Sequence, residues 1–359
     1  MMLEKYKTKT IASFQIPYLQ FLDANAQPTQ PLPEWTKDAD ELIRLYGYMV
    51  LTRAIDKKAF NLQRTGKLGT YPPCLGQEAL TVGMGAALKP EDVFAPYYRD
   101  LGTYLMRNIL PEEIYAIWGG DERGNYFQHN KEDLPLCPLI AGQYLHAAGV
   151  AFALKYRKEN RAVLVSGGDG STSKGDFYEA INLAGVWHLP LVFIINNNQW
   201  AISTPKNQQT AAQTYAQKGI AAGIDSYQVD GNDVIAVKEI LTESLNQARL
   251  NHQPSLIEAV TFRLSDHTTA DDASRYHDKE KLEQAWENEP IKRFQKFLME
   301  KNFWNDEKEK ALEKTCEERV NQTVENYFNM APPKATDMFD YLFEKMPAFL
   351  EPQRKKVAQ

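Results

Sequence analysis

An aspartate between two glycines and a later run of asparagines are the residues of this chain best suited to hold a metal ion and an anion. Asp169 follows the apolar run AVLVSGG, and Asn198 follows the next apolar run, LPLVFIINN. The glycines allow a sharp turn and a close approach of the main chain to an anion, and the helix that follows adds its positive N-terminal end. Mg²⁺ takes one or two carboxylate or amide oxygens and fills its other positions with phosphate oxygens and water. The pattern predicts a Mg²⁺-diphosphate site, although Asp169 alone is equally compatible with a structural strand-to-helix turn.

Asp169 and Asn198 can belong to one site only if they lie at the carboxyl ends of neighbouring parallel strands. In the middle region of the chain, short apolar runs alternate with helical segments. Such alternation is typical of parallel βαβ units, and ligands bind outside the carboxyl ends of their strands. We therefore predict an α/β fold with a parallel sheet covered by helices on both faces. The expected strands cover 92–97, 162–168, 189–197, 227–229 and 255–263, and the expected helices cover 143–158, 175–187, 211–222 and 233–250.

The two ends of the chain differ from this middle region. Residues 1–36 are rich in Gln, Pro and Thr around one strand-like run, which predicts an N-terminal arm. An α/β domain is expected over 37–276. Beyond it, charged helical segments predict a helical C-terminal extension over 277–359, with no room for a second sheet. The helices expected outside the sheet region cover 38–64, 278–301, 306–329 and 336–346.

Composition excludes several classes of function. The 41 Lys and Arg residues against 47 Asp and Glu give a net charge of −6, which provides no basic surface for a nucleic acid. The cysteines, Cys74, Cys137 and Cys316, have no CxxC spacing, which argues against a disulfide framework or a thiolate metal site. No run reaches the roughly 18 apolar residues of a membrane span, and no signal peptide pattern is present. We expect a cytoplasmic protein that binds neither nucleic acid nor membrane.

Several motifs together resemble one family of enzymes. A GDG motif followed by an NN pair after the next strand is typical of thiamine diphosphate enzymes. Over residues 40–350 the chain resembles the alpha subunit of the thiamine diphosphate-dependent component of 2-oxo acid dehydrogenase complexes, which decarboxylates pyruvate or branched-chain 2-oxo acids. The motifs that carry the resemblance are LGQEAL (75–80), YYRDLG (97–102), IAGQYLHAAG (140–149), GDFYEAINLAG (175–185), AISTP (201–205), VDGND (229–233) and HTTADDASRY (267–276).

The resemblance implies thiamine diphosphate and Mg²⁺ as cofactors and a thiamine diphosphate-binding fold of the diphosphate type. By position in the family motifs, the side chains of Asp169 and Asn198 bind the metal ion. Trp200, where relatives often have Tyr or Phe, adds its main-chain carbonyl. The diphosphate contacts that the family implies are those of Tyr98, Arg99, Gly170 and Ser171.

The family also places residues around the thiazolium ring and on a loop over the site. Ile140 corresponds to the apolar wedge that keeps the cofactor bent, and Pro138 stands in the same wall, where some members have Gly. His267 corresponds to the histidine that contacts cofactor and substrate, which makes it the expected catalytic residue. Thr268 and Ser274 fall near regulatory phosphoserines of mitochondrial relatives, and a phosphate there would repel neighbouring aspartates and disorder the loop.

One catalytic group is missing from this chain. Thiamine enzymes need a carboxylate against the aminopyrimidine ring, and two-domain relatives supply it from a second α/β domain. Because this chain has only helical segments after residue 265, we expect the carboxylate to come from a beta subunit in an α₂β₂ heterotetramer. The resemblance further implies a lipoyl domain and the core of the acyltransferase as partners.

The substrate is open at this point. Pyruvate is the first choice, with reductive acetylation of lipoyl-lysine, and a branched-chain 2-oxo acid is the alternative, because HTTADDASRY is similar to both groups of relatives. An acetoin-cleaving member of the same family and a non-catalytic scaffold subunit are the further alternatives. The intact Asp169, Asn198, Tyr98 and Arg99 argue against the scaffold.

Overall fold

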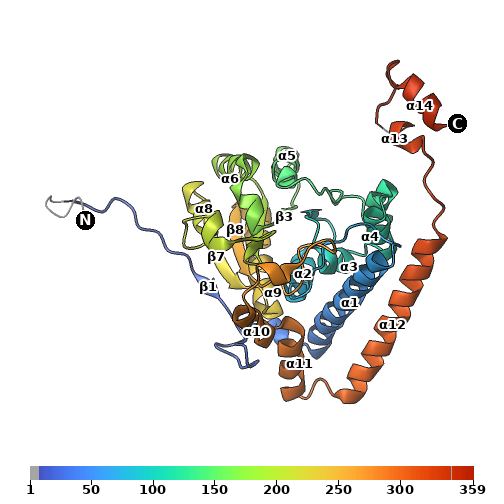
Figure 1. Ribbon diagram of the computed structural model, residues 1–359. Helices are drawn as coiled ribbons and strands as arrows, with labels where there is room; N and C mark the ends of the chain where they lie inside the picture. Colours follow the sequence, from blue (N-terminus) through green and yellow to red (C-terminus); the bar gives the residue numbers. More distant parts are fainter. Residues whose placement is uncertain (1–7, 341) are drawn as a thin grey trace.

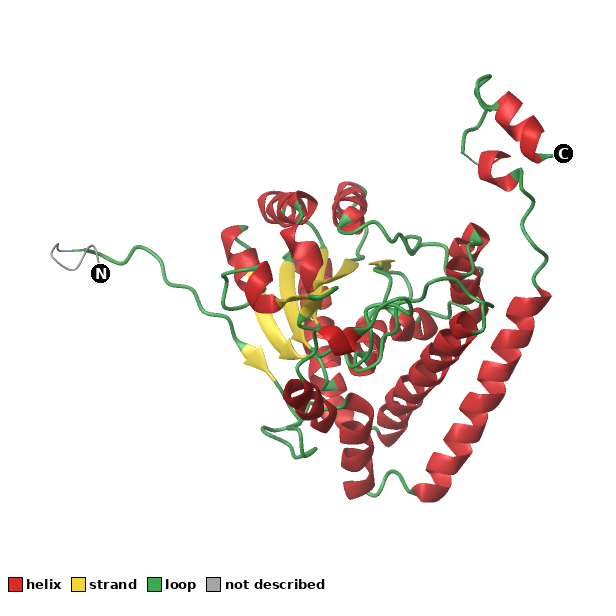
Figure 2. Cartoon of the chain, in the orientation of Figure 1, coloured by secondary structure: helices red, strands yellow, loops and turns green. Residues whose placement is uncertain are grey.

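A six-stranded parallel sheet forms the centre of the molecule in the computed structural model, which describes residues 8–340 and 342–359 (Figure 2). The strands are β1 (Tyr18–Leu19), β2 (Val93–Ala95), β3 (Val163–Gly168), β4 (Leu191–Asn197), β5 (Trp200–Ala201), β6 (Thr204–Pro205), β7 (Asp225–Asp230) and β8 (Ser255–Val260). Their order in the sheet is β1-β7-β8-β4-β3-β2, and β5 and β6 form a separate antiparallel hairpin. The predicted α/β fold with a parallel sheet is confirmed.

Helices cover both faces of this sheet, and each face has its own hydrophobic core. Leu164 of β3 packs into one core, while its neighbours Val163 and Val165 pack into the other. Because side chains of a strand alternate between faces, a continuous apolar run must be buried on both sides. The helices are α1 (Ala39–Arg64), α2 (Glu78–Ala87), α3 (Leu101–Met106), α4 (Pro111–Trp118), α5 (Gly142–Tyr156), α6 (Gly175–Trp187), α7 (Lys206–Gln209), α8 (Gln217–Ala221), α9 (Val234–Asn251), α10 (Lys279–Glu287), α11 (Pro290–Glu300), α12 (Asp306–Asn329), α13 (Asp337–Asp340) and α14 (Glu351–Val357).

Capping side chains and a proline set several of the helix boundaries. Asp38 accepts hydrogen bonds from two N–H groups at the start of α1, and Asp233 does the same for α9. The single helix expected over 278–301 is wrong, because Pro290 begins a new helix there. Glu289 caps that helix, α11, by accepting from the next two free N–H groups.

Other helices differ from expectation in length. The helix expected over 211–222 is reduced to α8, and the preceding residues form turns. The helix expected over 336–346 is also too long, because α13 ends at Asp340 and the chain turns from 342 onward; residue 341 lies outside the described residues. The short helices α2, α3 and α4 were not expected from the sequence, and all three are largely buried.

Both ends of the described chain leave the body of the molecule (Figure 1). Beyond β1, which pairs with β7 at the edge of the sheet, the N-terminal segment extends away. The long helix α12 runs beside α1, and α13 and α14 lie apart from the sheet and its helices. The division into an arm, an α/β domain and a helical extension stays a prediction. None of the helices in the described ranges combines the length and the apolar character that a membrane span requires.

Candidate functional site

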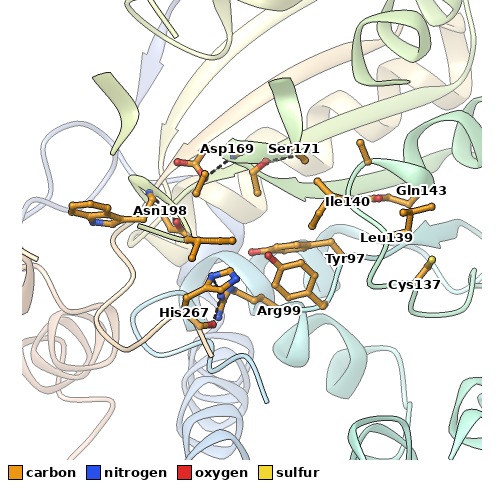
Figure 3. Close-up of a pocket in the computed structure, with 17 residues that line it drawn as sticks. Tyr97, Arg99, Cys137, Leu139, Ile140, Gln143, Asp169, Ser171, Asn198 and His267 are labelled. Carbon is orange, nitrogen blue, oxygen red and sulfur yellow. Dashed lines mark hydrogen bonds between the residues drawn. The ribbon is translucent and has the colours of Figure 1, made fainter. Parts of the chain in front are cut away.

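A cavity of about 230 Å³ opens at the carboxyl ends of β3 and β4 (Figure 3). Residues from five separate stretches of the chain meet there, at the edge of the sheet where ligands of open parallel sheets bind. The lining residues are Tyr97, Tyr98, Arg99, Cys137, Leu139, Ile140, Ala141, Gln143, Gly168, Asp169, Gly170, Ser171, Asn198, Trp200, Ala201, Ile202 and His267.

Asp169 stands at the start of a 3₁₀ turn, Asp169–Ser173, that joins β3 to α6. Its carboxylate is 1% exposed, and this burial raises the pKa of Asp169 to about 6. One oxygen accepts from the Gly170 N–H at 2.9 Å, and the other has only a long contact of 3.3 Å with the Gln209 amide. A buried carboxylate with so few strong partners is suited to a cation or a charged ligand.

Glycine at position 170 is required by a close approach of two backbones. A Cβ atom built there would lie 2.6 Å from the Cβ atom of Ala201 in the β5–β6 hairpin. The hairpin therefore packs directly on the turn that carries Asp169. Since Trp200 precedes Ala201 in the same hairpin, this packing also brings Trp200 to the cavity wall.

Asn198 follows β4 and is 3% exposed. The register of the sheet pairs Gly168 of β3 with Asn196 of β4, so the residues that follow each strand lie side by side. The Asn198 amide donates to Gln77 at 3.2 Å, and its carbonyl oxygen accepts from the Trp200 N–H at 3.3 Å. The sequence-based convergence of Asp169 and Asn198 on one crevice agrees with this geometry.

Arg99 and His267 are in direct contact on the opposite side of the cavity from the sheet turn (Figure 3). The Arg99 Nη2 atom lies 2.9 Å from His267 Nδ1 and donates to the His267 carbonyl at 2.6 Å. A guanidinium only donates, so Nδ1 accepts and the ring proton is on Nε2. Burial and the charge of Arg99 lower the pKa of His267 to about 3. His267 is therefore a neutral imidazole at the cavity, with a donor at Nε2.

Arg263 is a residue of this site that the sequence analysis did not single out. It is fully buried, and it donates to the Ile202 carbonyl at 2.7 Å and to the Tyr276 hydroxyl at 2.7 Å. Its Nη1 atom also lies 3.3 Å from His267 Nδ1. A charged residue three positions after the buried strand β8 and four positions before His267 was the available signal. Gln77 and Gln209, which contact the two metal-site candidates, were also not singled out; Gln77 lies in the LGQEAL motif, whereas Gln209 carried no sequence signal.

The remaining wall of the cavity is apolar and partly open. Leu139 and Ile140 line it and are 67% and 41% exposed, so large apolar surface faces solvent at the mouth. Pro138 is exposed and is not among the lining residues, although its neighbours Cys137 and Leu139 are. The other predicted site residues, Tyr98, Arg99, Ile140, Asp169, Gly170, Ser171, Asn198, Trp200 and His267, all line this cavity.

The cavity matches a ligand with one charged and one apolar end. A carboxylate and a carboxamide meet at the sheet edge, Arg99 supplies a cation, and Ile140 supplies apolar surface. Within the described ranges, no group of three or more His, Cys, Asp or Glu side chains is placed to hold a metal ion without a ligand. A Mg²⁺ ion would therefore need phosphate oxygens or water to complete its shell, as is usual for this ion. The residues present fit a Mg²⁺-diphosphate group.

Comparison with known proteins gives a consistent result. The model of the family described as "Dehydrogenase E1 component" matches residues 46–335. The pyruvate dehydrogenase E1 component subunit alpha of Acholeplasma laidlawii is 38% identical over 335 residues, covering 92% of this chain and 96% of that protein. The protein of the same name from Staphylococcus aureus is 38% identical over 93% of this chain and 91% of its own length. The 3-methyl-2-oxobutanoate dehydrogenase subunit alpha of Mycobacterium tuberculosis is 36% identical over 97% of this chain and 95% of its own.

The matched region contains the whole sheet except β1, and all the residues that line the cavity. The match therefore includes every element that builds the site, and it extends through α12. This family uses thiamine diphosphate, which agrees with the chemistry of the cavity. The chain belongs to the dehydrogenase E1 component family, as an alpha subunit of the 2-oxo acid dehydrogenase type.

Proposed function

We propose that this chain binds Mg²⁺ and thiamine diphosphate in the cavity and forms the diphosphate-binding half of an enzyme that decarboxylates pyruvate and acetylates lipoyl-lysine. The observation that carries the proposal is the meeting of Asp169 and Asn198 at the ends of β3 and β4. When bound, thiamine diphosphate supplies the electron sink that the decarboxylation of a 2-oxo acid requires. The protein supplies binding, orientation and charge.

The metal ion is proposed to be held by the Asp169 and Asn198 side chains and the Trp200 carbonyl. For the diphosphate, the proposed contacts are Tyr98, Arg99 and the N–H groups of Gly170 and Ser171. Arg99 is suited to this role because its guanidinium is a permanent cation with a forked set of donors.

The apolar wall and the loop are proposed to orient the reacting end of the cofactor. Ile140 would provide the apolar surface for the thiazolium ring. Pro138 would belong to the same wall, and its exposure in this chain leaves it free to contact a partner subunit. His267 is proposed to donate a hydrogen bond from Nε2 to substrate oxygen, because a neutral imidazole with Nδ1 occupied can act only as a donor there.

An alpha subunit of this family implies a beta subunit and an acyltransferase core as partners. Asp169 is the only carboxylate among the residues that line the described cavity, and it is committed to the metal ion in this proposal. The carboxylate that contacts the aminopyrimidine ring is therefore assigned to the beta subunit, at the open mouth beside Leu139 and Ile140. We propose an α₂β₂ heterotetramer that presents this site to the lipoyl domain.

Calorimetric titration of thiamine diphosphate with Mg²⁺ tests the split site. The titration is run on this chain alone and on its mixture with the beta subunit. Binding and pyruvate decarboxylation are expected only in the mixture. Turnover by the single chain would contradict the proposal, because it would require a catalytic carboxylate within this chain.

One comparison suggests a second candidate substrate, a branched-chain 2-oxo acid. The relative from Mycobacterium tuberculosis, named for 3-methyl-2-oxobutanoate, is nearly as similar as the relatives named for pyruvate. Turnover by the assembled enzyme on the two acids decides between them. A higher kcat/KM on pyruvate is expected, and a ratio in favour of the branched acid would overturn that assignment.

A further inference from the structure

A buried lysine stands behind the turn that carries Asp169. Lys218, in α8, is 7% exposed, and no Asp or Glu oxygen of the described residues lies within 4.0 Å of its ammonium group. The rings of Tyr178, Tyr215 and Phe177 surround it, with centroids 5.2, 5.4 and 6.0 Å from Nζ. A lysine is almost never buried without an acidic partner, because desolvation of the charge is costly. The aromatic rings offset part of this cost through cation–π attraction.

The ammonium group is bonded directly to the 3₁₀ turn. Lys218 Nζ donates to the Thr172 carbonyl at 2.9 Å and to Thr172 Oγ1 at 2.8 Å. The Thr172 hydroxyl in turn donates to the Asp169 carbonyl at 2.7 Å. Neither Lys218 nor Thr172 lines the cavity, so Lys218 holds the turn from outside the cavity wall.

A second chain of contacts leads from the same lysine to the Asp169 side chain. The ring of Tyr215 is one of the three that pack around Lys218, and its hydroxyl donates to Gln209 at 3.1 Å. The Gln209 amide reaches the Asp169 carboxylate at 3.3 Å. The lysine therefore supports both the main chain and the side chain of Asp169.

We infer that Lys218 is a positioning residue for diphosphate binding: it fixes the turn that presents Asp169, Gly170 and Ser171, and its uncompensated charge favours an anion there. The inference rests on the proposed function, because it assumes that the cavity holds a diphosphate. A positive charge in a poorly solvated region acts over a longer range than one in water, so it attracts the diphosphate without touching it.

Another lysine provides a control, because it contacts the C-terminal end of α6, whereas Lys218 contacts the turn that precedes α6. Lys155 donates to the Trp187 carbonyl at 2.6 Å and to the His188 carbonyl at 3.1 Å, at the C-terminal end of α6. Like Lys218, it donates hydrogen bonds to residues at a junction between elements, in this case the junction after α6. It lies far along the helix from the turn, and it does not line the cavity.

The test measures the affinity of the assembled alpha and beta subunits for thiamine diphosphate with Mg²⁺, by calorimetry. Lys218→Met keeps the length and apolar packing of the side chain and removes its charge and its donors. It is expected to weaken binding by about tenfold or more, as is typical for residues that orient ligating groups. Lys218→Arg, which keeps charge and donors, is expected to restore most of the affinity, and Lys155→Met is expected to leave it unchanged.

Two further readouts separate positioning from general stability. With saturating cofactor, kcat of Lys218→Met is expected to stay within about twofold of the wild type, so the loss appears in the cofactor Kd. The salt dependence of that Kd is expected to decrease, because a charge that attracts the diphosphate has been removed. A folded Lys218→Met complex with wild-type affinity and salt dependence would overturn the inference.

A second variant keeps the test decisive if Lys218→Met does not assemble. Thr172→Val preserves the shape of the side chain and removes the hydroxyl between Lys218 and the Asp169 carbonyl. It is expected to weaken cofactor binding severalfold, and unchanged binding would count against the inference. If the wild-type complex binds no thiamine diphosphate, the proposed function fails; if it binds and both variants bind equally well, only the role of Lys218 fails.

Discussion

Two walls of the cavity are built in different ways. The sheet wall, which comprises residues 166–173 with Asp100 packed against them, is fixed by buried contacts, such as those between Asp100 and Ser166 and from Thr172 to the main chain of Asp169. The covering loop, residues 265–277, is held largely by side-chain hydrogen bonds and includes exposed residues such as Ser274 and Arg275. The fold sets the shape of the sheet wall, whereas a few polar contacts set the shape of the covering loop.

The two walls also respond to pH with opposite signs. Burial raises the pKa of Asp100 to about 7, so the folded state holds this proton more tightly than the unfolded chain does. The stability that this provides is complete below about pH 4 and is lost as the pH rises through 7. Burial and two arginines lower the pKa of His267 to about 3, so its contribution is present above about pH 6.5 and is lost as the pH falls. Acid therefore favours the sheet wall and disfavours the covering loop.

The largest effect is expected from removal of the proposed metal ligand in the sheet wall. Asp169→Ala is expected to abolish Mg²⁺-dependent binding of thiamine diphosphate, a loss of about a hundredfold or more, because Asp169 is the only carboxylate among the described residues that line the cavity. Calorimetry on the complex with the beta subunit measures it. The melting temperature should not fall, and Glu179→Ala, an exposed acid on α6, serves as the control. Undiminished binding would refute the metal assignment.

The next effect concerns the stability of the sheet wall. As the pH rises from 4 to 8, the wild type is expected to lose on the order of 3 kcal/mol of unfolding free energy relative to Asp100→Asn. The reason is that only the wild type has a buried carboxyl group that must ionise in this range. Urea unfolding of the cofactor-free chain at several pH values gives this difference. A constant difference across the range would show that Asp100 does not titrate as its burial implies.

The covering loop is expected to open when its main anchor is removed. Arg263→Gln loses charged hydrogen bonds to Ile202, Tyr276 and His267. Such bonds contribute roughly 1.5–3 kcal/mol, so tryptic cleavage after the exposed Arg275 should accelerate about tenfold or more. Mass spectrometry of the first fragments measures the rate.

Another buried arginine controls for a general loss of stability in this experiment. Arg293→Gln removes hydrogen bonds to Asp230, which is not part of the covering loop. It should leave cleavage after Arg275 near the wild-type rate. Equal acceleration by both variants would remove the proposed special role of Arg263.

A weaker effect is expected from acid on the wild-type loop. Hydrogen exchange of the backbone amides in 265–277, corrected for the intrinsic pH dependence, should increase severalfold as the pH falls from 7 to 4, because His267 resists protonation in its folded position. The amides of β3 and β4 provide the internal reference and should show no such increase. A loop that exchanges independently of pH would break the contrast between the two walls.

The smallest effect is expected from a negative charge at the surface of the loop. Ser274→Glu removes the hydrogen bond from the serine hydroxyl to Asp272 and places a second carboxylate beside it. Repulsion between neighbouring exposed charges is weak, so cleavage after Arg275 should increase only about twofold. Thr268→Glu, near Asp271, extends the test. A decrease in cleavage with either variant would contradict the hypothesis that a phosphate disorders this loop.

The alternation of apolar runs and helices predicted the sheet and its helices closely, because strands buried on both faces leave a strong signal. The bounds of α6 and α12 agree with expectation. Prediction failed for the helix expected over 278–301, where a local signal was overlooked: Pro290 cannot continue a helix and begins a new one. It also failed for α2, α3 and α4, whose burial on nearly all sides removes the amphipathic period.

The sequence alone predicted the chemistry of this protein, from a carboxylate and a carboxamide after consecutive strands and from motifs that resemble those of the family. These are properties of neighbouring residues and of short spacings. Only the tertiary structure decided that Arg263 holds His267 with Nδ1 as acceptor, and that Lys218 supports the turn of Asp169 from behind. Such contacts join residues far apart in the chain, and burial gives them their strength, so no local pattern in the sequence records them.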